Sequence, residues 1–266
     1  MVKLSMNETT TYRWSFEEDV LAYAAAGIPA IGVWRQKLSD FGPQKGAELL
    51  EEQGMEVSHL FWAGGFTGSD GRTFRESLDD AMEALRTAAE IRARSLVVYS
   101  GARAGHTANH ARRLIKDALT QLAPLATELN VKLAVEPMHP GCAGQWTFLT
   151  SLDDVLAMLA AVGSPQVQMV FDTYHLGQQP GLLERIPALI PQIALVQLGD
   201  LKSPPVGEQN RCRLGTGVLP LREIVAALRA AGYDGHFDVE LIGEEIETCD
   251  YRSLVEQAKS DVQELL

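Results

Sequence analysis

The chain has 266 residues, of which 46% are hydrophobic and 22% are charged, and its formal net charge is −12. This length is close to the ~250 residues of a typical (β/α)8 barrel and is enough for one large core. The acidic balance disfavours binding to nucleic-acid phosphates, and no apolar stretch is long enough to cross a bilayer.

Eight short apolar runs alternate with eight helical patterns. The runs are typical of strands covered on both faces, and the longer patterns are amphipathic helices. In chain order, the first half contains strand Val2–Met6, helix Phe16–Ala26, strand Ile28–Trp34, helix Pro43–Glu52, strand Val57–Trp62, helix Thr73–Ile91, strand Ser95–Ser100 and helix Ala108–Leu129. The second half contains strand Lys132–Glu136, helix Ser151–Ala161, strand Val167–Asp172, helix Leu182–Ile190, strand Ile193–Leu198, helix Leu221–Ala231, strand Phe237–Leu241 and helix Tyr251–Leu265.

This alternation indicates an α/β fold with a parallel sheet and right-handed crossovers. An open, doubly wound sheet is the rival fold. No GxGxxG motif follows an early strand, and eight repeats at this length favour closure. We therefore predict a single (β/α)8 TIM barrel over residues 1–266, with the irregular loop Gly199–Gly217 able to cover its mouth.

Polar residues follow four consecutive predicted strands, at the barrel end where TIM-barrel chemistry occurs. They are Glu136, Asp172, Gln197 and Glu240. Three converging buried carboxylates would repel one another, and a divalent cation resolves that conflict. Oxygen donors suit Mg, Mn or a similar ion. A single strand-end acid is more often a cap or a salt-bridge partner, so the residue pattern alone leaves both interpretations open.

Five segments resemble the sugar phosphate isomerase/epimerase superfamily, the xylose isomerase-like TIM barrels. They are LAVEPMHP at 133–140, VFDTYHLG at 170–177, IALVQLGD at 193–200, RLGTGVLPL at 213–221 and GYDGHFDVELIG at 232–243. The resemblance implies one divalent metal ion (Mn, Mg or Co, with Zn as a further option) bound by Glu136, Asp172, Gln197 and Glu240. Glutamine at the third position is similar to the hydroxypyruvate isomerase branch.

The resemblance also implies substrate-binding residues. His175 resembles a substrate-binding histidine of ketose epimerases, and Arg213 or Arg211 lies where an arginine often contacts substrate. His59 and Trp62, near the end of the third predicted strand, could line the pocket, although core packing explains them equally well.

The resemblance implies an isomerase or epimerase that moves a proton next to a carbonyl through a metal-stabilised enediolate. The substrate would be a small sugar or sugar-like hydroxycarbonyl, and Glu136 and Glu240 would be both ligands and acid/base groups. However, Cys142 stands where ketose 3-epimerases carry another glutamate. The segment from Glu136 to Pro140 is similar instead to the catalytic subunits of lyases that eliminate the aglycone from 3-oxo-glycosides, with His139 as the base.

We expect a cytoplasmic protein with no nucleic-acid or membrane partner. Three scattered cysteines do not form a disulfide framework, and Met1–Thr11 lacks the basic flank and apolar run of a signal peptide. The resemblance implies a homodimer, or a small second subunit if the lyase alternative holds. A DNA-repair endonuclease of the same architecture is less favoured, because it needs several metals and a basic face.

Overall fold

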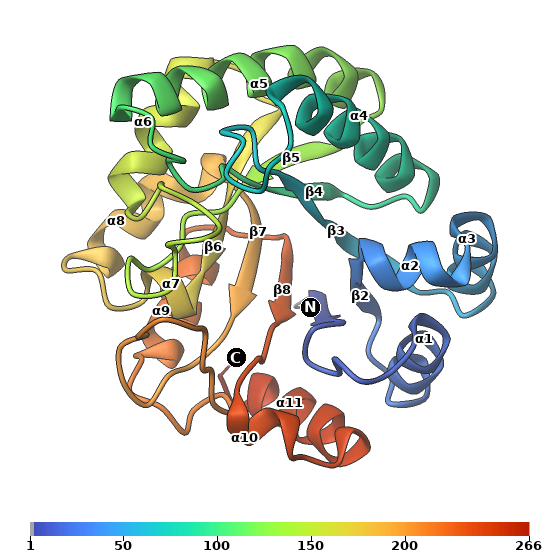
Figure 1. The fold of residues 1–266 in the computed structure, drawn as a ribbon. Helices are drawn as coiled ribbons and strands as arrows, with labels where there is room; N and C mark the ends of the chain where they lie inside the picture. The colour runs from blue at the N-terminus through green and yellow to red at the C-terminus, as the bar shows by residue number, and fades with distance from the viewer. Residues whose placement is uncertain (1–2, 266) are drawn as a thin grey trace.

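The computed structural model describes residues 3–265, and its eight parallel strands close into one barrel with helices around it (Figure 1). The strands are β1 Lys3–Asn7, β2 Ala30–Trp34, β3 Glu56–Gly64, β4 Ser95–Tyr99, β5 Lys132–Val135, β6 Val167–Asp172, β7 Ile193–Leu198 and β8 His236–Val239. Each strand pairs in parallel with the next, and β8 pairs with β1, so the predicted TIM barrel is confirmed. Val2, which we placed in the first strand, lies outside the described residues.

The helices largely follow the predicted intervals. They are α1 Phe16–Ala25, α2 Arg35–Phe41, α3 Pro43–Glu52, α4 Phe74–Glu90, α5 Ala108–Glu128, α6 Leu152–Val162, α7 Thr173–Leu176, α8 Leu182–Leu189, α9 Leu221–Ala230, α10 Glu244–Glu247 and α11 Tyr251–Leu265, with a 3-10 turn at Ile190–Gln192. Three short helices, α2, α7 and α10, were not predicted. In residues 3–265, no helix is both long enough and apolar enough to span a membrane.

An apolar layer fills the inside of the barrel beneath its C-terminal mouth. Its buried members are Phe61, Val97, Ala134, Val170 and Leu195, with Trp34 and Trp62 packed against it. Side chains alternate between the two faces of a strand, so the residues two positions beyond Ala134, Val170 and Leu195 also point inward. The chain therefore aims Glu136, Asp172 and Gln197 into the mouth, directly above this layer.

A buried polar network lies deeper in the barrel, between β1, β3 and β8. Asp238 accepts hydrogen bonds from Ser5 Oγ at 2.6 Å and from Asn7 Nδ2 at 3.0 Å. Asn7 Nδ2 also lies 3.3 Å from His59 Nε2. Burial raises the pKa of Asp238 to about 8 and lowers the pKa of His59 to about 3, so both groups favour their neutral forms near pH 7.

Candidate metal and substrate site

The four predicted ligands come from adjacent strands and converge at the mouth. Glu136 directly follows β5, Asp172 ends β6 and pairs in register with Gln197 on β7, and Glu240 directly follows β8. None of these four side chains is more than 4% exposed. The structure therefore brings together the residues that the sequence analysis selected, and their role as metal ligands remains a prediction.

Unsatisfied polar atoms concentrate at this site. Among residues 3–265, six buried side-chain nitrogen or oxygen atoms lack a hydrogen-bond partner. Four of them belong here: Glu136 Oε2, His175 Nε2, Gln197 Oε1 and Glu240 Oε2, the last of which also has an ion pair with Arg211 at 3.2 Å. Buried polar atoms are normally paired, because an unpaired one costs about 1–3 kcal/mol. This concentration is what a binding site for an ion or a polar ligand requires.

The electrostatics of the carboxylates also fit a cation. Burial, followed by repulsion from Glu240 and Asp172, raises the pKa of Glu136 well above its ordinary value. Burial also raises the pKa of Glu240, to about 7. A divalent cation would offset both effects, because it compensates the buried negative charge. The oxygen-only donor set of three carboxylates and one amide therefore fits a hard or borderline divalent ion.

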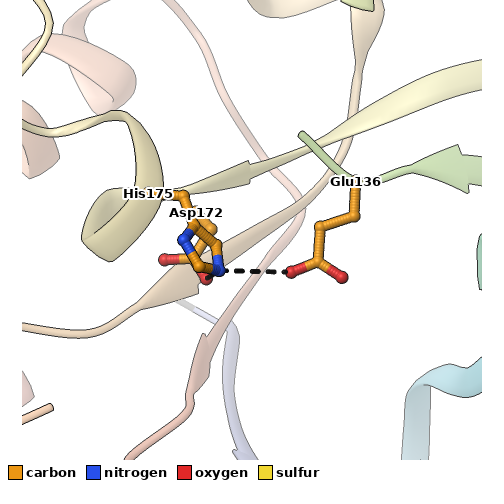
Figure 2. A group of neighbouring side chains, drawn as sticks. All are labelled: Glu136, Asp172 and His175. Carbon is orange, nitrogen blue, oxygen red and sulfur yellow. Dashed lines mark ion pairs between the residues drawn. The ribbon is translucent and has the colours of Figure 1, made fainter. Parts of the chain in front are cut away.

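His175 lies against two of these carboxylates, and all three side chains point toward one another (Figure 2). Its Nε2 is 3.9 Å from Glu136 Oε1 and 3.8 Å from Asp172 Oδ2. Its Nδ1 accepts the backbone N–H of His139 at 3.1 Å. Burial lowers the pKa of His175 to about 3, so the ring is neutral and its single proton belongs on Nε2. This tautomer makes His175 Nε2 a hydrogen-bond donor into the site, although Glu136, Asp172 and His175 also offer ligand atoms within 4.8 Å of one another, close enough to hold one metal ion.

Arg211 brings a permanent positive charge into the same space. Its Nη2 lies 2.8 Å from Asp172 Oδ2 and 3.2 Å from Glu240 Oε2, and its Nη1 donates to Asp172 Oδ1 at 3.2 Å. Burial alone would raise the pKa of Asp172, but the guanidinium holds it below its ordinary value. The sequence analysis named Arg211 as a candidate substrate contact and missed its ion pairs with the predicted ligands.

The loop between β7 and α9 delivers this arginine. Asp200 forms an isolated antiparallel bridge with Cys212, and its Oδ2 accepts the N–H groups of Gly215 and Gly217, each at 3.0 Å. These bonds fold the glycine-rich segment back on the end of β7. Asp200 therefore has a structural role in this loop.

Three other candidate residues, unlike Arg211, form no ion pair with the predicted ligands. Arg213 points away, with its Nη2 3.9 Å from Asp261 Oδ1 on α11, so the structure does not bring it to the site. His59 is fully buried in the network below the mouth. His139 is half-buried, and its Nδ1 accepts the N–H of Gly141 at 3.0 Å. That bond occupies the lone pair that a general base would use.

Trp62 belongs to an aromatic wall at the mouth. Its ring centroid lies 5.0 Å from that of Trp146 and 6.5 Å from that of Tyr99. Trp34 stacks on Phe61 at 6.4 Å, with 12° between the ring planes. The mouth thus has an aromatic arc on β2–β4 and a polar arc on β5–β8. Trp146, on the loop after β5, was missed because no periodicity marks its position.

Comparisons with known proteins agree with this architecture. Residues 20–264 match the family model of the xylose isomerase-like TIM barrel. An inosose isomerase of Halalkalibacterium halodurans is 26% identical over 162 residues, which is 58% of this chain and 55% of that protein, so the chain spans about half the length of this relative. A putative hydroxypyruvate isomerase of Streptomyces coelicolor is 26% identical over 241 residues, which is 82% of each protein.

Two solved structures show the same fold. Protein SMc04130 of Sinorhizobium meliloti superimposes with a TM-score of 0.91 and 25% identity, over 98% of both chains. The IOLI protein with a bound zinc atom superimposes with a TM-score of 0.86 and 20% identity, over 99% of this chain and 98% of that chain.

Proposed function

The chain belongs to the xylose isomerase-like TIM barrel family, and we propose that it is a divalent-metal-dependent isomerase or epimerase of a small sugar or sugar-like hydroxycarbonyl. One observation carries this proposal: of the six buried side-chain polar atoms without a hydrogen bond in residues 3–265, four gather where the predicted ligands meet. Relatives named as isomerases support the reaction class.

Glu136, Asp172, Gln197 and Glu240 would hold the metal ion. Manganese, magnesium or cobalt suits three carboxylates and an amide oxygen, and the zinc in the IOLI structure makes zinc a further option. When bound, such an ion polarises the carbonyl oxygen of a substrate and lowers the cost of removing the neighbouring proton.

Residues of the site would also orient the substrate and transfer the proton. His175 Nε2–H points between Glu136 and Asp172, where it can donate to a substrate oxygen and orient the substrate. Glu136 and Glu240 directly follow β5 and β8, so a substrate between them has a carboxyl group on each side for proton transfer. Return of the proton to the neighbouring carbon gives isomerisation, and return to the opposite face of the same carbon gives epimerisation.

The lyase alternative gains no specific support from the geometry. It assigns the base to His139, whose Nδ1 accepts the Gly141 N–H at 3.0 Å. A neutral imidazole in this arrangement carries its proton on Nε2 and has no free lone pair. Release of an aglycone from a 3-oxo-glycoside would nevertheless favour elimination over isomerisation.

Glu240→Gln tests the proposal, with Glu244→Gln as the matched control on an exposed carboxylate four residues away. We expect Glu240→Gln to weaken Mn²⁺ binding by more than about a hundredfold, beyond the cost of losing an outer-shell partner. Calorimetry would measure binding, and interconversion of hydroxypyruvate, inososes and ketohexoses would measure turnover. Chelation should abolish turnover, and Mn²⁺ should restore it. Full turnover by the chelated protein, or by Glu240→Gln, contradicts the proposal.

A further inference from the structure

Arg211 is a buried cation with no solvent around it. Its side chain is among the largest fully buried side chains described in the protein. Its Nη2 lies 2.8 Å from Asp172 Oδ2 and 3.2 Å from Glu240 Oε2. A buried charge of this kind persists only when opposite charges and hydrogen bonds surround it. Asp172 contacts the guanidinium through both carboxylate oxygens, which makes the pair bidentate.

The surrounding chain is shaped to hold the guanidinium in this position. The guanidinium carbon lies 4.5 Å from the centroid of the Tyr174 ring, a cation–π distance. Gln209 Oε1 accepts from Nη2 at 2.9 Å. Gly199 leaves the space that Nη1 occupies, because a Cβ there would collide with that atom. The tyrosine, the glutamine and the glycine together form a seat for a cation.

This seat overlaps half of the predicted ligand set. Arg211 contacts Asp172 and Glu240, whereas Glu136 Oε2 and Gln197 Oε1 have no hydrogen-bond partner among the described residues. A guanidinium and a dication that share the same two carboxylates repel each other, and this repulsion is strong where water is excluded. The two cations therefore compete for Asp172 and Glu240.

Building on the proposed function, we propose that Arg211 is a built-in counter-cation that a divalent metal ion displaces. In the metal-free protein, the guanidinium neutralises Asp172 and keeps Glu240 beside it, so the ligands stay assembled. When a metal ion binds, Arg211 withdraws from these carboxylates. The affinity for the metal ion is then set by how much more strongly Asp172 and Glu240 bind the ion than they bind the guanidinium, and not by the ligands alone.

The test compares Mn²⁺ binding by chelator-treated wild type, Arg211→Gln and Arg211→Lys, with Arg213→Gln as the control on an arginine that points away. We expect Arg211→Gln to bind Mn²⁺ about tenfold more tightly, within the usual range of coupling between sites. Its metal-free melting temperature should fall, and Mn²⁺ should raise that temperature more than it does in wild type. Arg213→Gln should stay close to wild type, and Arg211→Lys, which keeps the charge but loses the bidentate contact, should fall between wild type and Arg211→Gln. Equal or weaker Mn²⁺ binding by Arg211→Gln overturns the inference.

A second variant keeps the inference testable if Arg211→Gln does not fold. Gly199→Ala keeps the charge but pushes the guanidinium off its seat, so it should also tighten Mn²⁺ binding, and unchanged affinity would count against displacement. The two proposals fail separately. Mn²⁺-dependent turnover with unaltered affinity in both variants overturns only the displacement of Arg211. Tighter Mn²⁺ binding without any isomerase or epimerase turnover supports displacement and contradicts the proposed function.

Discussion

Replacing Asp238 by asparagine should make the protein less sensitive to alkaline pH. Burial raises the pKa of Asp238 from its ordinary 3.8 to about 8, so the folded state holds a proton that the unfolded state releases. The contribution of Asp238 to the free energy of unfolding is therefore greatest below pH 4. It falls as pH rises toward 8, by at most about 1.36 kcal/mol per pH unit. Between pH 5 and pH 8, the loss amounts to at most about 4 kcal/mol.

Asparagine can keep both contacts without a charge, although the direction of the hydrogen bond with Ser5 is reversed. Its carbonyl can accept from Asn7 Nδ2, and its amide can donate to Ser5 Oγ, the two groups that contact Asp238 at 3.0 Å and 2.6 Å. Urea unfolding of chelated wild type and Asp238→Asn at pH 5 and pH 8 measures the effect. We expect the advantage of the variant to grow by a few kcal/mol across this range. Asp234→Asn, at an exposed site, should show no such growth. A constant difference for Asp238→Asn would refute the reasoning.

Three further predictions concern residues outside the ligand set. Lys37→Met should lower the free energy of unfolding by about 3–5 kcal/mol in urea titrations, because Lys37 Nζ lies 2.6 Å from the buried Asp19 Oδ2. Adding Asp19→Asn should recover part of that loss, and a double variant no more stable than the single one would contradict this. Gly64→Ala should sharply lower the melting temperature, since φ is +144° and a Cβ would collide with the Tyr99 carbonyl oxygen. Cys249 is the one cysteine that is not buried, so a thiol reagent should modify one thiol per folded chain and three after unfolding.

Much of the barrel could be predicted because strands covered on both faces are continuous apolar runs. The expected strand Val57–Trp62 lies within β3, which extends to Gly64. The short helices escaped prediction for local reasons. Helix α2 begins directly after Trp34 with no capping side chain, and the cap of α7 is Asp172, which we had assigned only to the metal.

The convergence of Glu136 and Asp172 could be predicted, because polar residues at the ends of parallel strands share one edge of the barrel. The choice between Arg211 and Arg213 could not be made in this way. Both lie in an irregular loop where no periodicity shows which side chain points inward, and the residues that contact Arg211, Asp172 and Tyr174, are far away in sequence. The pairing of Arg211 with predicted ligands is therefore a tertiary effect without a local sequence signal.

Closure of the barrel by β8 has a consequence for the order of assembly. Glu136, Asp172 and Gln197 emerge from a ribosome well before Glu240, which directly follows the strand that seals β7 to β1. A nascent chain therefore lacks Glu240, the last of the four predicted ligands, until β8 has been synthesised. If the protein binds a metal ion as proposed, the complete set of four donors exists only after β8 has closed the barrel.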